Sequence, residues 1–116
     1  MEGENALAEL ETRKSQCFQL LKLHPNKIPI ILEPSQLKSS FVLGENKFLV
    51  PNSYTLQELV FHLRKRLKMR KTDGLFLVIG ERHLTCLNKT IKAIYEEHRN
   101  LDGFLYVKYS TEACWG

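Results

Sequence analysis

The stretch "TLQELVFHLRKRLKMRKTDGLFLVI", residues 55–79, predicts a helix followed directly by a strand. Thr55 and Glu58 form a T-x-x-E capping box, a common start of a helix. One apolar stripe at helical spacing follows: Leu56, Leu59, Val60, Leu63 and Leu67. "TDG" at 72–74 predicts the end of the helix. "LFLVI", 75–79, is apolar at every position and predicts a fully buried strand in the centre of a sheet.

Towards the N-terminus, the sequence predicts another helix and two more strands. Apolar residues recur at helical spacing between Ala6 and Leu23, and Pro25 prevents the helix from continuing beyond about His24. "KIPIILE", 27–33, is a β-branched run typical of a strand. Its proline cannot donate to a ladder, which predicts an edge position or a bulge. "KFLVP", 47–51, predicts a second short strand.

Towards the C-terminus, a short helix and a final strand are expected. The helix is marked by an apolar and aromatic set, Ile91, Ile94, Tyr95 and His98. "LDG", 101–103, turns the chain into "FLYVKY", 104–109, whose Leu105, Val107 and Tyr109 share one face of a strand. The resulting order of elements predicts an α+β domain with helices packed across one mixed sheet, and the ubiquitin-like arrangement is the obvious candidate.

Length and composition restrict the class of protein. The 116 residues suffice for one domain, and the longest apolar run is far shorter than the ~20 residues that cross a bilayer. The acidic start "MEGENALAELETRK" does not resemble a secretory signal. Cys17, Cys86 and Cys114 are odd in number and lack metal-ligand spacing, which favours free thiols in a reducing cytosol. We expect no metal and no cofactor.

The net charge of +4 permits binding of nucleic acid, anionic lipid or acidic peptides. The basic run "RKRLKMRK", 64–71, fits a surface for nucleic acid or phosphate head groups, but also a solvated helix end whose cations complement the helix dipole. No aromatic platform or base-reading motif accompanies it, so we favour the solvated helix end. The histidines are scattered, and no nucleophile or acid–base pattern is visible, so we expect no enzyme; they are His24, His62, His83 and His98.

The segment "NKFLVP", 46–51, allows two interpretations. It fits a plain core strand. It also fits an edge strand, blunted by Lys47 and Pro51, that accepts a partner peptide as an additional strand. Spacing alone does not decide between them.

Several co-linear motifs together resemble a known family. They are "HPNKIPIILE" (24–33), "NKFLVP" (46–51), "LVFHLRKRLKMR" (59–70), "DGLFLVIG" (73–80), "IYEEHRNLDGFLYVKYS" (94–110) and the ending "CWG". From about Cys17 to Gly116, with one insertion near Gly80 to Cys86, the chain is similar to the autophagy ubiquitin-like modifiers, the family of GABARAP, light chain three and yeast autophagy-related protein eight.

The resemblance implies a ubiquitin-like β-grasp core with an N-terminal helical extension. The expected parts are the extension at 1–24, the core at 25–110 and a conjugation tail at 111–116. In this family the terminal glycine, here Gly116, passes through an activating and a conjugating enzyme and is joined to phosphatidylethanolamine. A glycine suits a narrow active-site channel because it has no side chain. Trp115 stands where relatives carry phenylalanine or tyrosine and would be recognised with the tail.

The family also binds peptides of the form aromatic-x-x-aliphatic beside the strand at 47–51. The resemblance places the aromatic pocket at Leu20, Pro29, Lys47, Leu49 and Phe104. It places the aliphatic pocket at Phe48, Val50, Pro51, Tyr54, Leu59 and Leu63, with Arg66 near the rim. Lys27 and Lys47 would meet acidic residues that flank such peptides. Departures at Gln16, His24 and His62 predict a different peptide preference.

The resemblance thus predicts a non-enzymatic, lipid-conjugated adaptor of autophagosome formation and cargo capture. Its partners would be the conjugation enzymes, cargo receptors and a phosphatidylethanolamine membrane, with no nucleic acid. It would be cytoplasmic and reach the autophagosome membrane on conjugation. The alternative is an unconjugated basic ubiquitin-like module that binds nucleic acid or the cytoskeleton; such a module has no need of Gly116.

Overall fold

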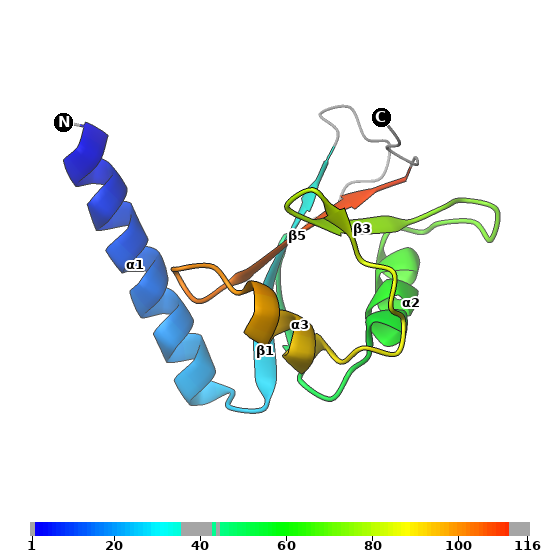
Figure 1. Cartoon of the computed structure of the whole chain (residues 1–116), viewed down its shortest axis with the longest axis horizontal. Helices are drawn as coiled ribbons and strands as arrows, with labels where there is room; N and C mark the ends of the chain where they lie inside the picture. Colours follow the sequence, from blue (N-terminus) through cyan, green and yellow to red (C-terminus); the bar gives the residue numbers. More distant parts are fainter. Residues whose placement is uncertain (1, 36–42, 44, 112–116) are drawn as a thin grey trace.

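Among the residues that the structure describes, the fold consists of one sheet and three helices. The computed structural model describes residues 2–35, 43 and 45–111. Residues 2–4 are described by their backbone only. In chain order the elements are α1 (Glu2–Leu23), β1 (Lys27–Pro34), β2 (Lys47–Pro51), α2 (Leu56–Arg66), β3 (Phe76–Ile79), β4 (Arg82–His83), α3 (Ile91–His98) and β5 (Leu105–Ser110). In Figure 1, α1 stands on one side of the sheet and α2 on the other.

The sheet is mixed and has the strand order β2-β1-β5-β3-β4. The two strands from opposite ends of the chain, β1 and β5, pair in parallel at its centre. All other pairs are antiparallel, and β2 lies at one edge of the sheet with β1 as its neighbour. This arrangement confirms the predicted α+β class and ubiquitin-like fold.

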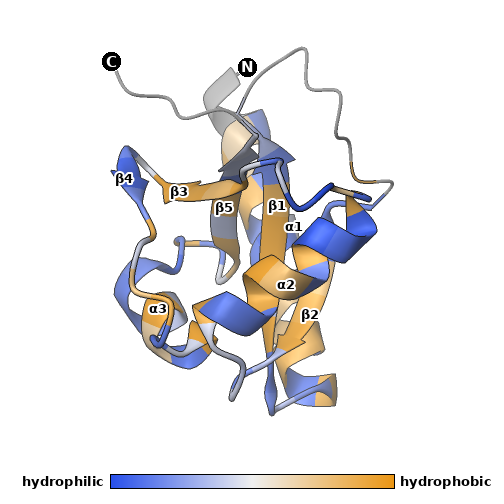
Figure 2. Ribbon diagram, turned by 90° about the vertical axis from the view of Figure 1, so that its right-hand side faces the viewer, coloured by the Kyte–Doolittle hydropathy of each residue, from blue (hydrophilic) through white to orange (hydrophobic). Residues whose placement is uncertain are grey.

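The central strand β1 is covered on both faces. Ile28, Ile30 and Leu32 point into the main core, which they share with α2 and α3, whereas Ile31 packs with Cys17 and Phe104 beneath α1. Figure 2 shows β1 as an apolar band with α2 in front and α1 behind. Apolar positions on both faces are the expected signature of a strand between two layers. On β5, Leu105, Val107 and Tyr109 share the main-core face, as predicted.

The capping box of α2 is present, but the helix ends earlier than "TDG" predicts. The Thr55 side chain accepts from the backbone N–H of Glu58, whose carboxylate accepts in return. The helix ends at Arg66 because Lys68 adopts the left-handed region, with φ 53°. The N–H groups of Lys68 and Met69 then donate to the carbonyls of Lys65 and Arg64, which is a Schellman motif. This end of α2 was not predicted because Lys68 occupies the left-handed position where glycine is usual.

The prediction of an edge position or bulge for Pro29 was wrong. The strand β1 lies between β2 and β5, and Pro29 is paired with Leu49 in regular register. Pairing with β5 begins only one residue later, at Ile30 with Leu105. The N–H of Leu32 donates towards the β2 side, to Asn46, so the alternation of a strand directs the nitrogen of Pro29 towards β5. Because Pro29 precedes the β5 ladder, its missing donor costs little.

The strand β3 is less buried than its sequence predicts. It has neighbours on both sides, β5 and β4, but only Leu77 of its four residues is buried. Phe76 and Val78, on the other face, are half-buried, and Phe76 meets His83 of β4 edge to face. The two-residue strand β4 was not predicted, since Gly80 and its neighbours showed only a turn.

The helix α1 is held to the sheet by one buried carboxylate. Asp102 is 2% exposed and accepts from the Arg13 Nε at 3.1 Å, from the Tyr106 hydroxyl and from the Phe104 N–H. Beside it, Gly103 packs against Cys17 so closely that an added Cβ would lie 2.7 Å from the Cys17 Sγ. We call Arg13, Asp102 and Tyr106 the helix clamp.

Gly103 and Gly80 form a matched pair that tests the packing of α1. Both have positive φ, 93° and 62°, but nothing lies within 4 Å of a Cβ at Gly80. Gly80→Ala should therefore cost only backbone strain, about 1 kcal/mol. Gly103→Ala adds a collision with Cys17 and should cost at least about 2 kcal/mol more, by the usual penalty of overpacking. Denaturant unfolding measures both, and equal losses would contradict the tight contact of α1 with residues 102–104.

Candidate functional site

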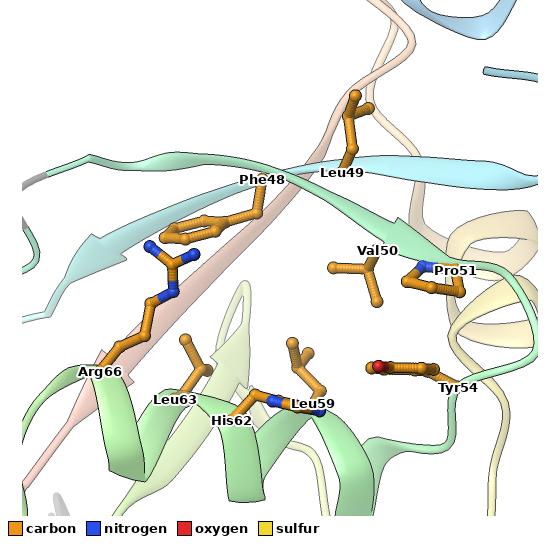
Figure 3. Close-up of a pocket in the computed structure, with 9 residues that line it drawn as sticks. All are labelled: Phe48, Leu49, Val50, Pro51, Tyr54, Leu59, His62, Leu63 and Arg66. Carbon is orange, nitrogen blue, oxygen red and sulfur yellow. The ribbon is translucent and has the colours of Figure 1, made fainter.

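The edge strand β2 separates two pockets. Its register with β1 runs from Lys47 opposite Ile31 to Pro51 opposite Lys27. Because side chains alternate along a strand, Phe48 and Val50 point to the α2 side of the sheet and Leu49 to the α1 side. Figure 3 shows this alternation, with Phe48 and Val50 directed towards α2 and Leu49 directed away. Of the two interpretations left open for 47–51, the strand order supports the edge strand.

The pocket on the α2 side has a volume of about 230 Å³. Its base is apolar, formed by Val50 with Leu59 and Leu63 of α2, both of which are also core residues. The capping box positions these leucines, because it fixes where the helical stripe begins. The complete lining is Phe48, Leu49, Val50, Pro51, Tyr54, Leu59, His62, Leu63 and Arg66.

Two stacked pairs of side chains, each with at least one polar member, form the sides of this α2-side pocket. The His62 ring stacks on the Tyr54 ring, with centroids 5.4 Å apart and planes 12° apart. At the other end, the Arg66 guanidinium carbon lies 5.0 Å from the centre of the Phe48 ring, within cation–π range. The pocket thus combines an apolar base with a partly polar rim (Figure 3).

The pocket on the α1 side has a volume of about 330 Å³ and lies between α1 and the sheet. Its lining is Gln16, Gln19, Leu20, Leu23, Lys47 and Phe104. Phe104 forms its floor and is only 2% exposed. The Lys47 ammonium lies 5.8 Å from the centre of the Phe104 ring, so a cation stands at the entrance. The four residues from α1 fall on one helical face at i, i+3, i+4 and i+7 spacing.

The structure brings together most of the predicted site residues. All seven residues predicted for the aliphatic pocket and its rim line the α2-side pocket. Of the residues predicted for the aromatic pocket, Leu20, Lys47 and Phe104 line the α1-side pocket. Pro29 is fully buried, and Leu49 belongs to the lining of the α2-side pocket and not to that of the α1-side pocket, although its side chain is directed to the α1 face. Lys27 is exposed at the start of β1 and lines neither pocket.

Sequence reasoning missed several lining residues. Gln19 and Leu23 were not predicted, and Gln16 and His62 were noted only as departures from the family. The helical spacing from Gln16 to Leu23 is a signal that could have found the α1 residues. His62 could have been found by its position three residues after Leu59, on the same side of α2. Trp115 and Gly116 lie outside the residues that the structure describes.

The helix clamp supports the α1-side pocket from beneath, because it fixes the helix that supplies four lining residues. Burial, and then the hydrogen bond to Asp102, raises the pKa of Tyr106 to about 12. Burial and the nearby charge of Asp102 also raise the pKa of the Cys17 thiol. At neutral pH the Tyr106 phenol of the clamp and the neighbouring Cys17 thiol are therefore both neutral.

The described part of the chain shows neither a metal centre nor a membrane span. Within it, no group of three or more histidine, cysteine or acidic side chains is arranged to hold a metal ion. No helix among the described residues has the length and hydropathy needed to cross a bilayer. Cys17 and Cys86 are free thiols, the first buried and the second exposed.

The fold and its two pockets define a ubiquitin-like protein, and comparisons identify the family. Residues 12–116 match the family model described as "Autophagy protein Atg8 ubiquitin like". Autophagy-related protein 8 of Mycosarcoma maydis is 35% identical, with 91% of this chain and 89% of the relative covered. Autophagy-related protein 8 of Schizosaccharomyces pombe is 34% identical, with 91% and 87% covered.

A solved structure agrees with these relatives. The crystal structure of Trypanosoma brucei ATG8 superposes with a TM-score of 0.81 at 35% identity, covering 92% of this chain and 91% of that one. The chain belongs to the Atg8 family of ubiquitin-like autophagy proteins. The resemblance noted in the sequence is confirmed.

The clamp predicts a specific alkaline instability. Because folding raises the pKa of Tyr106 from 10.0 to about 12, its contribution to stability is complete below pH 10 and is lost as the pH rises towards 12. The melting temperature should fall across this window, and Tyr106→Phe should remove part of the fall because its ring cannot ionise. Tyr54→Phe, which leaves the clamp unchanged, should retain the full fall. An identical pH profile for Tyr106→Phe and the unaltered chain would contradict the assignment.

Proposed function

We propose that the chain is a conjugated ubiquitin-like modifier that captures aromatic-x-x-aliphatic peptides at β2. The observation that supports peptide capture best is the pair of pockets on opposite faces of one edge strand. A partner peptide would add to β2 as a further strand, and its backbone would supply hydrogen bonds common to all such peptides. The pockets would then select the side chains.

The spacing of the peptide motif follows from the geometry of strands. Residues three apart in an extended strand point to opposite faces, because successive side chains alternate. An added strand would therefore direct its aromatic residue to one pocket and its aliphatic residue to the other. The two side chains would be separated by about 10 Å along the strand, from a rise of about 3.3 Å per residue.

The lining of each pocket supports the assignment of each side chain. On the α1 side, Phe104 and the cation of Lys47 suit an aromatic ring, which can contact both an apolar surface and a positive charge. On the α2 side, Val50, Leu59 and Leu63 suit an aliphatic side chain. Lys27, exposed at the start of β1, and Lys47 would attract acidic residues flanking the motif.

Conjugation is proposed through Gly116, which would be joined to phosphatidylethanolamine by the activating and conjugating enzymes of autophagy. Family membership supports this proposal, and so does the sequence "CWG" at 114–116. Trp115 would help those enzymes recognise the tail. The protein would act as a substrate and adaptor and not as a catalyst. It would be cytoplasmic before conjugation and on the autophagosome membrane after it.

The tail is tested by reconstitution with the two enzymes, ATP and phosphatidylethanolamine vesicles. Gly116→Ala should fold normally but conjugate poorly, since its methyl group would crowd an extended channel. Deletion of Gly116 should abolish the lipid-bound species on a denaturing gel. A deleted chain that still becomes lipid-bound would refute the modifier proposal and favour the unconjugated module.

The pockets are tested by pairing variants with altered peptides. Leu49→Ala shortens a side chain on the α1 face, and Phe48→Ala removes a ring from the α2-side pocket. Each should weaken a Trp-x-x-Leu peptide by the burial energy of one apolar group, about 1.5–3 kcal/mol, or roughly tenfold or more. Leu49→Ala should reduce the affinity for an Ala-x-x-Leu peptide much less, because this peptide has no aromatic side chain to lose contact. Phe48→Ala should likewise reduce the affinity for a Trp-x-x-Ala peptide much less, because that peptide has no leucine side chain to lose contact. Calorimetric titration measures each affinity.

Two controls protect this experiment. Lys47→Ala should weaken the peptide less than either apolar change, and its effect should shrink as salt is added, because rim charges are screened. Melting curves must show that Phe48→Ala and Leu49→Ala remain folded, since both residues also contact neighbours. Losses that are equal for the matched and truncated peptides would contradict the assignment of one side chain to each pocket.

A further inference from the structure

A compact basic surface lies at the C-terminal end of α2. Residues 64–71, which we call the basic turn, contain six cations and no acid: Arg64, Lys65, Arg66, Lys68, Arg70 and Lys71. Of these, only Arg64 is half-buried, and the others are exposed. Arg66 also contributes to the α2-side pocket, where it contacts Phe48. The peptide site does not account for the remaining five.

The basic turn is held in one conformation by its own hydrogen bonds. After the Schellman motif reverses the chain, the Arg64 guanidinium donates to the carbonyl of Arg70 at 2.7 Å. The Arg70 N–H and guanidinium both donate to the carboxylate of Asp73, and the Arg70 side chain remains 82% exposed. These bonds fold residues 67–71 back towards the end of α2, so the cations do not continue along a longer helix.

This surface lies beside the base of the C-terminal tail. The strand β3 begins opposite the end of β5, since Phe76 pairs with Ser110. Two residues before β3, an ideal Cβ on Gly74 would lie 3.9 Å from the carbonyl oxygen of Thr111. In Figure 1 the end of β5 lies at the opposite end of the sheet from α3 and the last turn of α1.

We infer that the basic turn binds the anionic phospholipid head groups of the membrane to which the tail is attached. The inference rests on the proposed function, because conjugation at Gly116 is what brings a bilayer to this end of the molecule. The five residues 112–116 can span at most about 17 Å, at up to ~3.4 Å per residue. A tail of this length allows the basic turn to come within the screening length of about 8 Å from the anionic surface, where its cations are attracted, whereas cations at the far end of the sheet stay farther from that surface.

Vesicle sedimentation with the unconjugated full chain tests the surface by itself. The basic-turn variant is Lys65→Gln, Lys68→Asn and Lys71→Gln, where asparagine tolerates the positive φ of residue 68. The control variant is Lys14→Gln, Lys22→Gln and Lys92→Gln, from α1 and α3. All six lysines are exposed, and each triple lowers the net charge from +4 to +1.

Vesicles of phosphatidylcholine with phosphatidylserine should bind the unaltered chain at low salt, and vesicles of phosphatidylcholine alone should not. Each lost cation near the surface weakens binding about fivefold, so the basic-turn variant, which loses three cations, should bind about a hundredfold more weakly. The control should stay within about threefold, and binding should vanish in high salt. An equal loss in both triples, or equal binding to neutral vesicles, would overturn the inference. So would a single-stranded RNA that binds the basic turn more tightly than the anionic vesicles do.

A second measurement uses the conjugated chain on vesicles that contain phosphatidylserine. Lys68 and Lys71 should be protected from acetylation relative to the unconjugated chain, and Lys92 should not. Unchanged labelling of Lys68 and Lys71 would overturn the inference even where conjugation succeeds. A chain that fails to conjugate contradicts the proposed function instead, and the sedimentation result still decides whether the basic turn binds anionic lipid.

Discussion

The parallel pairing of β1 with β5 is the constraint on which the rest of the structure depends. It joins the first and last strands of the described chain at the centre of the sheet, with Ile30 opposite Leu105 and Leu32 opposite Val107. Because β1 is apolar on both faces, α2 and α3 must cover one side and α1 the other. Everything at the edge strand follows from this, since β2 can extend the sheet only on the free side of β1.

The two pockets are products of that layering. An edge strand between two helical layers has a groove on each side, where its side chains meet α1 or α2. The α2-side groove is fixed by the same leucines that form the core, so its shape is as stable as the fold. The α1-side groove depends on a helix held by the clamp around Asp102 and by the packing of Cys17 with Ile31 and Phe104, so its width depends on how α1 docks on the sheet. In the proposed capture of two side chains, one pocket is therefore formed by core residues and the other by a helix that packs on the sheet.

Polar residues contribute to the rims of both pockets. His62, stacked on Tyr54, and Arg66, above Phe48, make the rim of the α2-side pocket partly polar. Gln16 and Gln19 do the same at the α1-side pocket. The basic turn adds a third polar surface at the end where β5 leads into the tail. The proposed peptide site and the proposed membrane contact are therefore adjacent along α2. They share Arg66 and otherwise consist of different residues.

The sequence by itself determined the elements and the family. Local signals were enough to predict α2, whose capping box and leucine stripe are both present. They were also enough to predict the strands at 27–33 and 47–51. Co-linear motifs sufficed for the fold, since residues 12–116 match the family model, and they placed most of the residues that line the pockets. Only the tertiary structure decided the central position of Pro29, the early end of α2 at Arg66 and the half-exposed state of β3. It also decided the clamp, in which Arg13 meets Asp102 across 89 residues. Each depends on which strand or helix lies alongside, and a local pattern carries no information about a neighbour that is distant in the chain.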